Sequence, residues 1–288
     1  MHERNVRRIA AVTVTLVAAL GWASLASAAG AVDISSCQTL STPNTVYKLT
    51  ANLTRCGDCL VVASDRITID LQGHSITGQC KNSAGVTDRG VARDSTVVKN
   101  GSIASFGVGV LLSSSTRNQV RNIQVTSNII GIWAGDNSLV TSCSATFNRD
   151  MPEEYGYGII VGDHSQVEGC NASHNGLTGI LAGDHCLITR NTANLNIDEG
   201  IATGSSCIVS FNTAIFNEFD GIDVGDGSSA SGAHSLVTGN YVFGNGDGGI
   251  EVTCPSDVTN NTSSTNGSNY TFRSTNCHTS NNENGPPG

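Results

Sequence analysis

The side chains of this chain best suited to chemistry are carboxylates gathered in its C-terminal half. No Lys or Arg lies between Arg190 and Arg273. Because stacked like charges repel, carboxylates in such a stretch need a cation, a shared proton or contact with solvent. Five of them are candidates for such chemistry, and four of these share matching positions of an internal repeat in pairs: Asp198, Glu199, Asp220, Asp223 and Glu251.

These five carboxylates admit three interpretations. Asp223 and Glu251 share one outward position on successive repeats, and Glu199 and Asp220 share another. Calcium, a hard cation that takes several oxygen ligands, would draw on all five residues. Alternatively, Asp223 and Glu251 are a general acid and nucleophile, since neighbouring repeats allow the roughly 5 Å separation of a retaining glycosidase. A solvated acidic surface is the third interpretation.

Histidines recur at one turn position, which predicts an alternative, transition-metal site. His164, His185 and His234 occupy this position. Imidazole and thiolate together bind copper or zinc. Gly-Asp-His-Ser is also an ordinary turn sequence, and the chain has only two Met. The further candidate ligands beside the histidines are Asp163, Asp184, Cys186 and Cys207.

An apolar row with aromatic neighbours indicates a binding face. Trp133 belongs to the row, and Tyr155 and Tyr157 lie in a longer repeat at 149–157; a second longer repeat, at 227–233, flanks the other end of the same strand. Such loops on a rigid scaffold often carry function. The face is predicted to stack on sugars, to dock a protein, or to be covered by the loops or tail. The expected outward row is Leu111, Trp133, Ile160, Leu181, Ala202, Asp223 and Glu251.

These residues are positioned by a repeat of about 21–22 residues. Each unit carries a Gly-Ile or Gly-Val pair, as at Gly179 and Gly200, and few Leu recur, which excludes leucine-rich repeats. β-branched residues in alternating positions predict short strands in a solenoid with one continuous core. Asn series at fixed offsets predict corner ladders that pair the backbone: Asn128, Asn148, Asn175, Asn196, Asn217, Asn245 and Asn266, and Asn100, Asn191, Asn212, Asn240 and Asn261.

The N-terminus reads as a secretory signal at residues 1–28, with a basic start, an apolar stretch and Ala-Ser-Ala at its end. Its removal changes the net charge from −9 to −11, because three Arg and one Glu are lost. This charge argues against nucleic acid and anionic membranes as partners, and no later segment is apolar enough to span a membrane. We expect a secreted or periplasmic protein.

Ten Cys in an exported chain predict disulfides where the solenoid stops. Cys254 and Cys277 are expected to staple the last coil, and Cys143 and Cys170 to be reduced core thiols. For Cys186 and Cys207 a bond and a thiol stack are equally compatible with the spacing. Four N-terminal Cys should form two bonds, whose pairing among three possibilities the sequence leaves open: Cys37, Cys56, Cys59 and Cys80.

The coils, together with the stretch from Ile67 to Gly78 (Ile-Thr-Ile-Asp-Leu-Gln-Gly-His-Ser-Ile-Thr-Gly), resemble the right-handed parallel β-helix proteins of the pectin-lyase-like superfamily. Within this superfamily, the chain most resembles the exported NosD-like branch, in which the motif D-L-x-G-H-x-I-x-G opens the helix. The resemblance implies an all-β, single-stranded helix over 60–272, a Cys-rich cap at 29–59 and a polar tail at 273–288.

The resemblance also implies a function, because most characterised members bind or cleave acidic polysaccharides. We therefore expect binding or processing of an extracellular polysaccharide or cell-surface component through the acidic face, with calcium as the candidate cofactor. A metal-handling periplasmic protein and a non-catalytic surface or adhesion module are the alternatives. Enzyme motifs are sparse: Asn196-Ile197-Asp198 matches the N-x-D of polygalacturonases, D-P-H of alginate epimerases is absent, and the acidic half offers no lyase base between Arg190 and Arg273.

Overall fold

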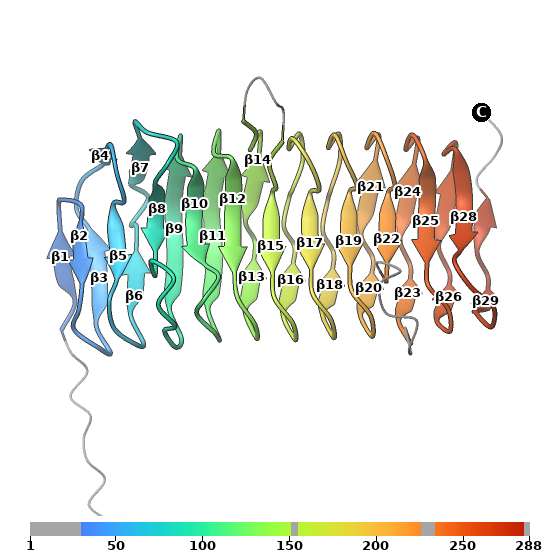
Figure 1. The fold of residues 1–288 in the computed structure, drawn as a ribbon, viewed down its shortest axis with the longest axis horizontal. Coiled ribbons are helices and arrows are strands. Elements are labelled where there is room, and N and C mark those ends of the chain that lie inside the picture. The colour runs from blue at the N-terminus through green and yellow to red at the C-terminus, as the bar shows by residue number, and fades with distance from the viewer. Residues whose placement is uncertain (1–29, 151–154, 226–233, 285–288) are drawn as a thin grey trace, which may run out of the picture.

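The computed structural model describes residues 30–150, 155–225 and 234–284, and within them all regular structure is parallel β-strand (Figure 1). The strands stack side by side along one axis, from β1 at one end to β29 at the other. The expected signal peptide lies outside the described residues. No helix in the described part of the chain is long and apolar enough to cross a membrane.

Three sheets form the walls of the solenoid. The first follows the order β1 (Val32–Ile34), β3 (Val46–Leu49), β6 (Thr68–Asp70), β9 (Val97–Ala104), β11 (Gln119–Thr126), β13 (Leu139–Thr141), β16 (Gln166–Glu168), β18 (Leu187–Thr189), β20 (Ile208–Ser210), β23 (Leu236–Thr238), β26 (Asp257–Thr259) and β29 (His278–Ser280). Beside this path, β7 (Ser75–Gly78) pairs with β4 (Leu53–Arg55) and β9, and β14 (Ser144–Thr146) pairs with β11.

The second sheet carries the Gly-Ile segments. Its order is β2 (Gln38–Leu40), β5 (Leu60–Val62), β8 (Ala84–Thr87), β10 (Val108–Leu112), β12 (Ile130–Ala134), β15 (Ile159–Val161), β17 (Ile180–Ala182), β19 (Ile201–Thr203), β22 (Ile222–Val224), β25 (Gly248–Val252) and β28 (Ser268–Phe272). A short third sheet contains β21 (Thr213–Ile215), β24 (Tyr241–Phe243), β27 (Thr262–Ser264) and β30 (Glu283–Asn284).

One apolar core runs the length of the stack, because alternate residues of each strand point inward. Ile180 pairs in register with Ile201, and Ile201 with Ile222, so a coil of 21 residues returns each side chain to its own row. All three isoleucines are fully buried. The predicted parallel β-helix is confirmed.

The first Asn series forms an unbroken ladder inside one corner. Asn196 donates from Nδ2 to Oδ1 of Asn217 at 3.0 Å and to the Ala172 carbonyl at 3.0 Å, and its Oδ1 accepts the Asn175 backbone N–H at 3.0 Å. This corner also explains the recurrent glycine: a Cβ on Gly200 would lie 2.6 Å from Nδ2 of Asn217. The ladder prediction is therefore confirmed for this series.

The second Asn series is confirmed with one correction. Asn191, Asn212, Asn240 and Asn261 form a ladder that ends at Asn282. Asn100 does not belong to it: its Nδ2 donates to Asp70 and its Oδ1 accepts from Asn122. Its φ of 62° identifies it instead as one of the left-handed corner residues, where Asn is tolerated. The ladder register is therefore one residue later than predicted in that coil.

The free cysteines take ladder positions. Cys170 accepts the Cys143 N–H at its sulfur, 3.4 Å away, and its own N–H donates to Oδ1 of Asn191 at 2.9 Å. Cys207 likewise accepts the Cys186 N–H at 3.2 Å and donates its own N–H to the hydroxyl of Ser235. All four thiols are buried and unbonded, which confirms the prediction for Cys143 and Cys170 and selects the thiol stack for the other pair.

Disulfides staple both ends, as predicted. Cys37 binds Cys59, Cys56 binds Cys80, and Cys254 binds Cys277. The coils nevertheless extend beyond the expected bounds. β1 to β4 pair in register with the following coils inside the segment 29–59, and β29 and β30 continue two sheets inside 273–288. Backbone pairing tolerates the less regular sequence there, because strand hydrogen bonds do not require the Gly-Ile or Asn signatures.

Candidate functional site

The predicted outward row lies on the second sheet, in register along the solenoid axis. Leu111 pairs with Trp133, Trp133 with Ile160, and the row continues through Leu181 and Ala202. Asp223 and Glu251 then follow on successive strands. Since each strand adds one outward side chain at this level, the surface is apolar in its middle coils and acidic toward β25.

A groove follows this row beside the ends of β12, β15, β17 and β19. Its floor is made of Trp133, Ile160, Leu181 and Ala202, and its two adjoining parts share Leu181, Ala182 and Gly183. Trp133 is 38% exposed, so its indole presents a substantial surface to a ligand. Several lining residues are glycines, which have no side chain to narrow the groove: Gly135, Gly162, Gly183 and Gly204.

Aspartates of three successive coils border the groove. Asp136, Asp163 and Asp184 all stand at the turn that follows the strand, and each turn begins with Gly-Asp. Oδ1 of Asp136 accepts the Asp163 N–H at 3.0 Å, and Oδ1 of Asp163 accepts the Asp184 N–H at 2.9 Å. These bonds fix the three carboxylates in one row. We call this row the aspartate rim.

Arg273 closes the acidic end of the row. It follows β28, and its Nη1 and Nη2 donate to the two carboxylate oxygens of Asp223 at 2.8 and 2.7 Å, while its Nε donates to Oε1 of Glu251 at 2.7 Å. The three side chains are only 15–28% exposed. Burial raises the pKa of Asp223 despite the opposing effect of Arg273. The two residues expected to act as acid and nucleophile are thus both bound to a guanidinium.

The other carboxylates of the predicted cluster lie at the opposite edge of the second sheet, before the strands. Oδ1 of Asp220 accepts the Gly248 N–H at 2.6 Å, and Oε2 of Glu199 accepts the Thr178 hydroxyl at 2.9 Å. Burial raises the pKa of Asp220 to about 7, and nearby carboxylates add to this effect. Burial and the adjacent Glu199 raise the pKa of Asp198 to about 6.

The five predicted calcium ligands are therefore divided between two places. Within residues 30–150, 155–225 and 234–284, no group of three or more His, Cys, Asp or Glu is arranged to hold a metal ion. His164 and His185 do occupy one column, with ring centroids 4.8 Å apart and planes within 2° of parallel. Parallel rings direct their nitrogen lone pairs side by side and do not converge on one ion.

The three predicted aromatic residues are also separated. Trp133 lies in the groove, whereas Tyr157 precedes β15 at the opposite edge of the sheet, where its carbonyl accepts the Gly131 N–H. Burial and the charges of Asp198 and Glu199 raise the pKa of Tyr157. Tyr155 is exposed in the longer loop, part of which, 151–154, lies outside the described residues, as does 226–233 of the second loop.

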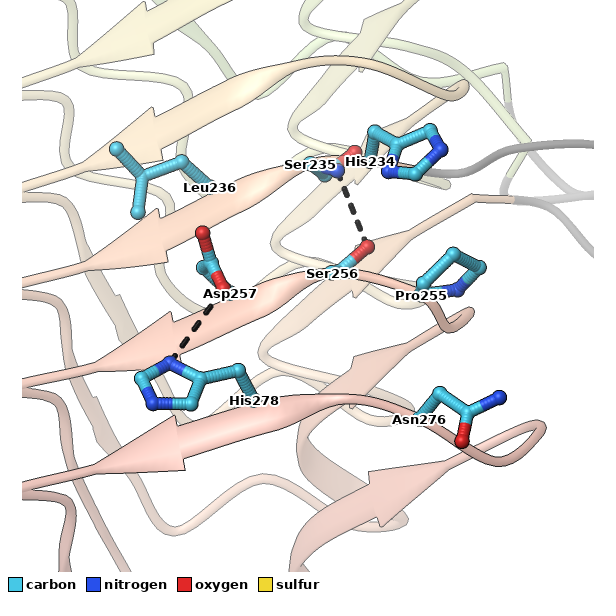
Figure 2. A pocket seen from close by; sticks show the side chains of 8 residues that line it. All are labelled: His234, Ser235, Leu236, Pro255, Ser256, Asp257, Asn276 and His278. Atoms are coloured by element: carbon cyan, nitrogen blue, oxygen red, sulfur yellow. Dashed lines mark hydrogen bonds and ion pairs between the residues drawn. The ribbon is translucent and has the colours of Figure 1, made fainter.

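A second hollow lies near the C-terminal disulfide, at a corner of the first sheet (Figure 2). Nδ1 of His278 lies 3.5 Å from Oδ1 of Asp257, and both side chains are largely exposed. Figure 2 shows His234 and His278 at opposite ends of this hollow. His234 lies two coils beyond His185, because Cys186 pairs with Cys207 and Cys207 with Ser235, so it does not extend the stacked pair of His164 and His185.

Sequence reasoning missed two features of the surface. The first is Arg273, which the sequence places in the polar tail. Arg273 lies 22 residues after Glu251, about one coil further along, and this spacing could have indicated that the two side chains are neighbours. The second is a set of exposed aromatics around the third sheet. Phe211 is 60% exposed, and Phe216 meets Phe243 edge to face. Phe211 and Phe216 occupy left-handed corner positions, where an aromatic residue has no turn signature.

Solved structures place this fold among known proteins. The A-modules of the Azotobacter vinelandii mannuronan C-5 epimerases AlgE6 and AlgE4 match with TM-scores of 0.60 and 0.57 at 12% and 11% identity. The matches cover 90% and 87% of this chain and 81% and 88% of theirs. The Dettilon tailspike protein gp208 matches at TM-score 0.56 and 12% identity over 76% of this chain, which spans only 48% of that protein.

No family model and no curated protein matches the sequence. The chain has a right-handed parallel β-helix fold, as the sequence predicts. At this identity the likeness establishes the fold and not the activity.

Proposed function

We propose that this protein is an exported polysaccharide-binding β-helix whose ligand lies along the groove of the second sheet. The observation that carries the proposal is the row from Trp133 to Ala202, which is apolar, partly exposed and parallel to the solenoid axis. A long, straight groove with a flat floor suits a linear polymer better than a compact metabolite. The indole of Trp133 supplies apolar area on which a sugar ring can stack.

Two further observations support this proposal. Structural neighbours include proteins named for their action on mannuronan. Three disulfides at the two ends fit folding in an oxidising compartment, in agreement with the expected signal peptide. Export from the cytoplasm is part of the proposal.

Turnover of a polysaccharide that reaches the opposite edge of the second sheet is a second candidate function, favoured by the carboxyls before β19 and β22. A carboxyl whose pKa lies near 6 or 7 is suited to exchange protons at neutral pH. Asp198 and Asp220 have this property, and Tyr157 lies near Asp198 and Glu199. This candidate is tested by product analysis with Asp198→Asn and Asp220→Asn, both of which should lose activity if these groups move protons.

Binding itself is tested by titrating the protein with a panel of neutral, uronic-acid and amino-sugar oligosaccharides in a calorimeter. We expect at least one class to bind, and Trp133→Ala to weaken that binding by about tenfold or more. Tyr241→Ala is the matched control, because Tyr241 is an exposed aromatic on the third sheet, away from the groove. Binding to no class, or equal losses in both variants, would refute the proposed groove.

A further inference from the structure

The aspartate rim has spare hydrogen-bonding capacity that faces solvent beside the groove. In each of Asp136, Asp163 and Asp184, Oδ1 accepts a backbone N–H from the next coil, at 3.0, 2.9 and 2.7 Å. Oδ2 makes no hydrogen bond or ion pair within the described structure. A carboxylate held through one oxygen presents the other in a fixed position, so ligand binding would cost little side-chain ordering.

Among the described residues, no Lys or Arg lines the groove to balance this rim. Its lining residues include Asp136, Asp163, Asp184 and Asp223 but no Lys or Arg. Arg273, which stands at the acidic end, binds both Asp223 and Glu251, so that group of three keeps a net negative charge. A groove lined by one sign of charge attracts ligands of the opposite sign and repels those of its own.

The rim repeats with the coils, so its charges repeat along the groove. Asp136, Asp163 and Asp184 follow three successive strands, and neighbouring strands lie about 4.8 Å apart in any sheet. A polymer that carries a positive group on successive units can meet one carboxylate after another while its rings rest on Trp133, Ile160 and Leu181. An ammonium group brings three donors, and its hydrogen bonds to carboxylates are stronger than those of neutral donors.

We propose that the groove selects a polysaccharide of amino sugars with free amino groups, such as a de-N-acetylated hexosamine polymer. This inference rests on the proposed function and names its ligand class. A uronic acid polymer would bring its carboxylates against the aspartate rim, and a neutral polymer would leave the rim without partners. The predicted ligand is positively charged and therefore differs from mannuronan, the uronic acid polymer that appears in the names of the structural neighbours.

The test compares three short oligosaccharides of equal length by calorimetry at a pH where the amino groups are protonated. They are an oligomer of unacetylated glucosamine, the corresponding oligomer of N-acetylglucosamine, and an oligomer of mannuronate. The mannuronate oligomer is titrated both with and without calcium. We expect the unacetylated ligand to bind at least about tenfold more tightly than either of the others, with an affinity that falls as salt is added. Tighter or equal binding of the acetylated ligand or of mannuronate would overturn the inference.

Variants separate specific contacts from general attraction to an acidic protein. The triple substitution Asp136→Asn, Asp163→Asn and Asp184→Asn keeps the oxygen that accepts each backbone N–H and removes three charges, so the fold should persist. We expect it to abolish the preference for the unacetylated ligand. The control triple, Asp33→Asn, Asp257→Asn and Glu283→Gln, removes as many exposed charges outside the groove and should keep the preference.

The outcomes distinguish this inference from the proposed function. If mannuronate or the acetylated ligand binds best and Trp133→Ala weakens it, the groove is confirmed and the amino-sugar inference is wrong. If the control triple loses the preference as fully as the rim triple, the attraction is general and the inference is again wrong. If none of these ligands and no member of the wider panel binds, the proposed function itself fails.

Discussion

Arg273 binds both carboxylate oxygens of Asp223 across two coils of the solenoid, although the two residues are 50 positions apart in sequence. The same guanidinium also binds Glu251 on the intervening coil. The carboxylates raise the pKa of Arg273, although burial opposes this effect. The acidic end of the groove is thus organised by one cation, which covers two carboxylates that otherwise repel each other.

We expect Arg273→Gln to lower the free energy of unfolding by about 1–3 kcal/mol, because it leaves two largely buried carboxylates without their partner. Denaturant unfolding measures this loss. The triple variant Asp223→Asn, Glu251→Gln and Arg273→Gln should recover most of it. An unchanged stability in Arg273→Gln would show that the ion pairs contribute little.

Calcium provides an independent readout of the same cluster. In the wild type, Arg273 occupies both oxygens of Asp223 and one of Glu251, so we expect calcium to change the melting temperature only slightly. In Arg273→Gln the two carboxylates become available, and calcium should raise the melting temperature by binding the native state. A large calcium effect in the wild type would instead support the five-carboxylate site expected from the sequence.

Asp220 should make stability fall as the pH rises. Its folded pKa of about 7 lies above the ordinary value of 3.8, so the native state holds a proton that the unfolded state has released. This contribution is fully present below about pH 4 and is lost as the pH rises through 7. Because Glu251, Asp223 and Asp247 also act on this carboxyl, the quantity to measure is the difference from Asp220→Asn.

Asp220→Asn keeps an oxygen that can accept the Gly248 N–H. Relative to the wild type, we expect the variant to gain stability between pH 4 and 7, a difference that melting curves at several pH values would show. Parallel pH profiles for the two proteins would contradict a protonated Asp220 in the fold.

Asn196→Leu should destabilise the protein by about 1–3 kcal/mol, because the Ala172 carbonyl and the Asn175 N–H lose their partner inside the corner. Asn82 is exposed, and we expect Asn82→Leu to remain within about 0.5 kcal/mol of the wild type. Asn269 is not a suitable control, although the sequence suggests a surface position, because its Oδ1 accepts from Asn266 and ends the ladder. Equal denaturation midpoints for the two variants would contradict the ladder.

Cys207 tests whether thiols act as ladder groups or only as apolar filler. Its sulfur accepts the Cys186 N–H and lies 3.3 Å from the Gly183 carbonyl, to which it donates. Ser235 accepts in the same way on the next coil. Cys207→Ser should therefore be tolerated better than Cys207→Val, which leaves a buried N–H unpaired at a cost of about 1–3 kcal/mol. If Val proves as stable as Ser, apolar packing alone explains the site.

The fold could be predicted because its signals repeat. Gly200 and Asn196 each have equivalents in neighbouring coils at the same offset. A wrong alignment of one coil is therefore revealed by comparison with the others. Asn100 shows the limit: a lone Asn in an irregular coil fits either of two adjacent columns. The end coils carry few of the repeated signals, and their strands were therefore assigned to a cap and a tail.

The candidate site was only partly predictable. Alternation along the strands predicts the row from Leu111 to Glu251, because the direction of a side chain follows from strand geometry. The partner of Asp223 depends on how far a long Arg side chain reaches across two coils, and repeat position does not specify this. Likewise, a shared column brings His164 and His185 together but does not determine the orientation of their rings.

The most direct test of the groove uses its tryptophan as a reporter. The chain has two Trp, Trp22 and Trp133, and Trp22 lies within the expected signal peptide at 1–28, so a protein produced without that segment fluoresces from Trp133 alone. We predict that an oligosaccharide that binds in calorimetry changes the Trp133 emission in a saturable way, with a midpoint equal to the calorimetric Kd. The corresponding monosaccharide should not change the emission in this way. Saturable binding in calorimetry with no change in Trp133 emission would place the ligand elsewhere and contradict the groove as the site of function.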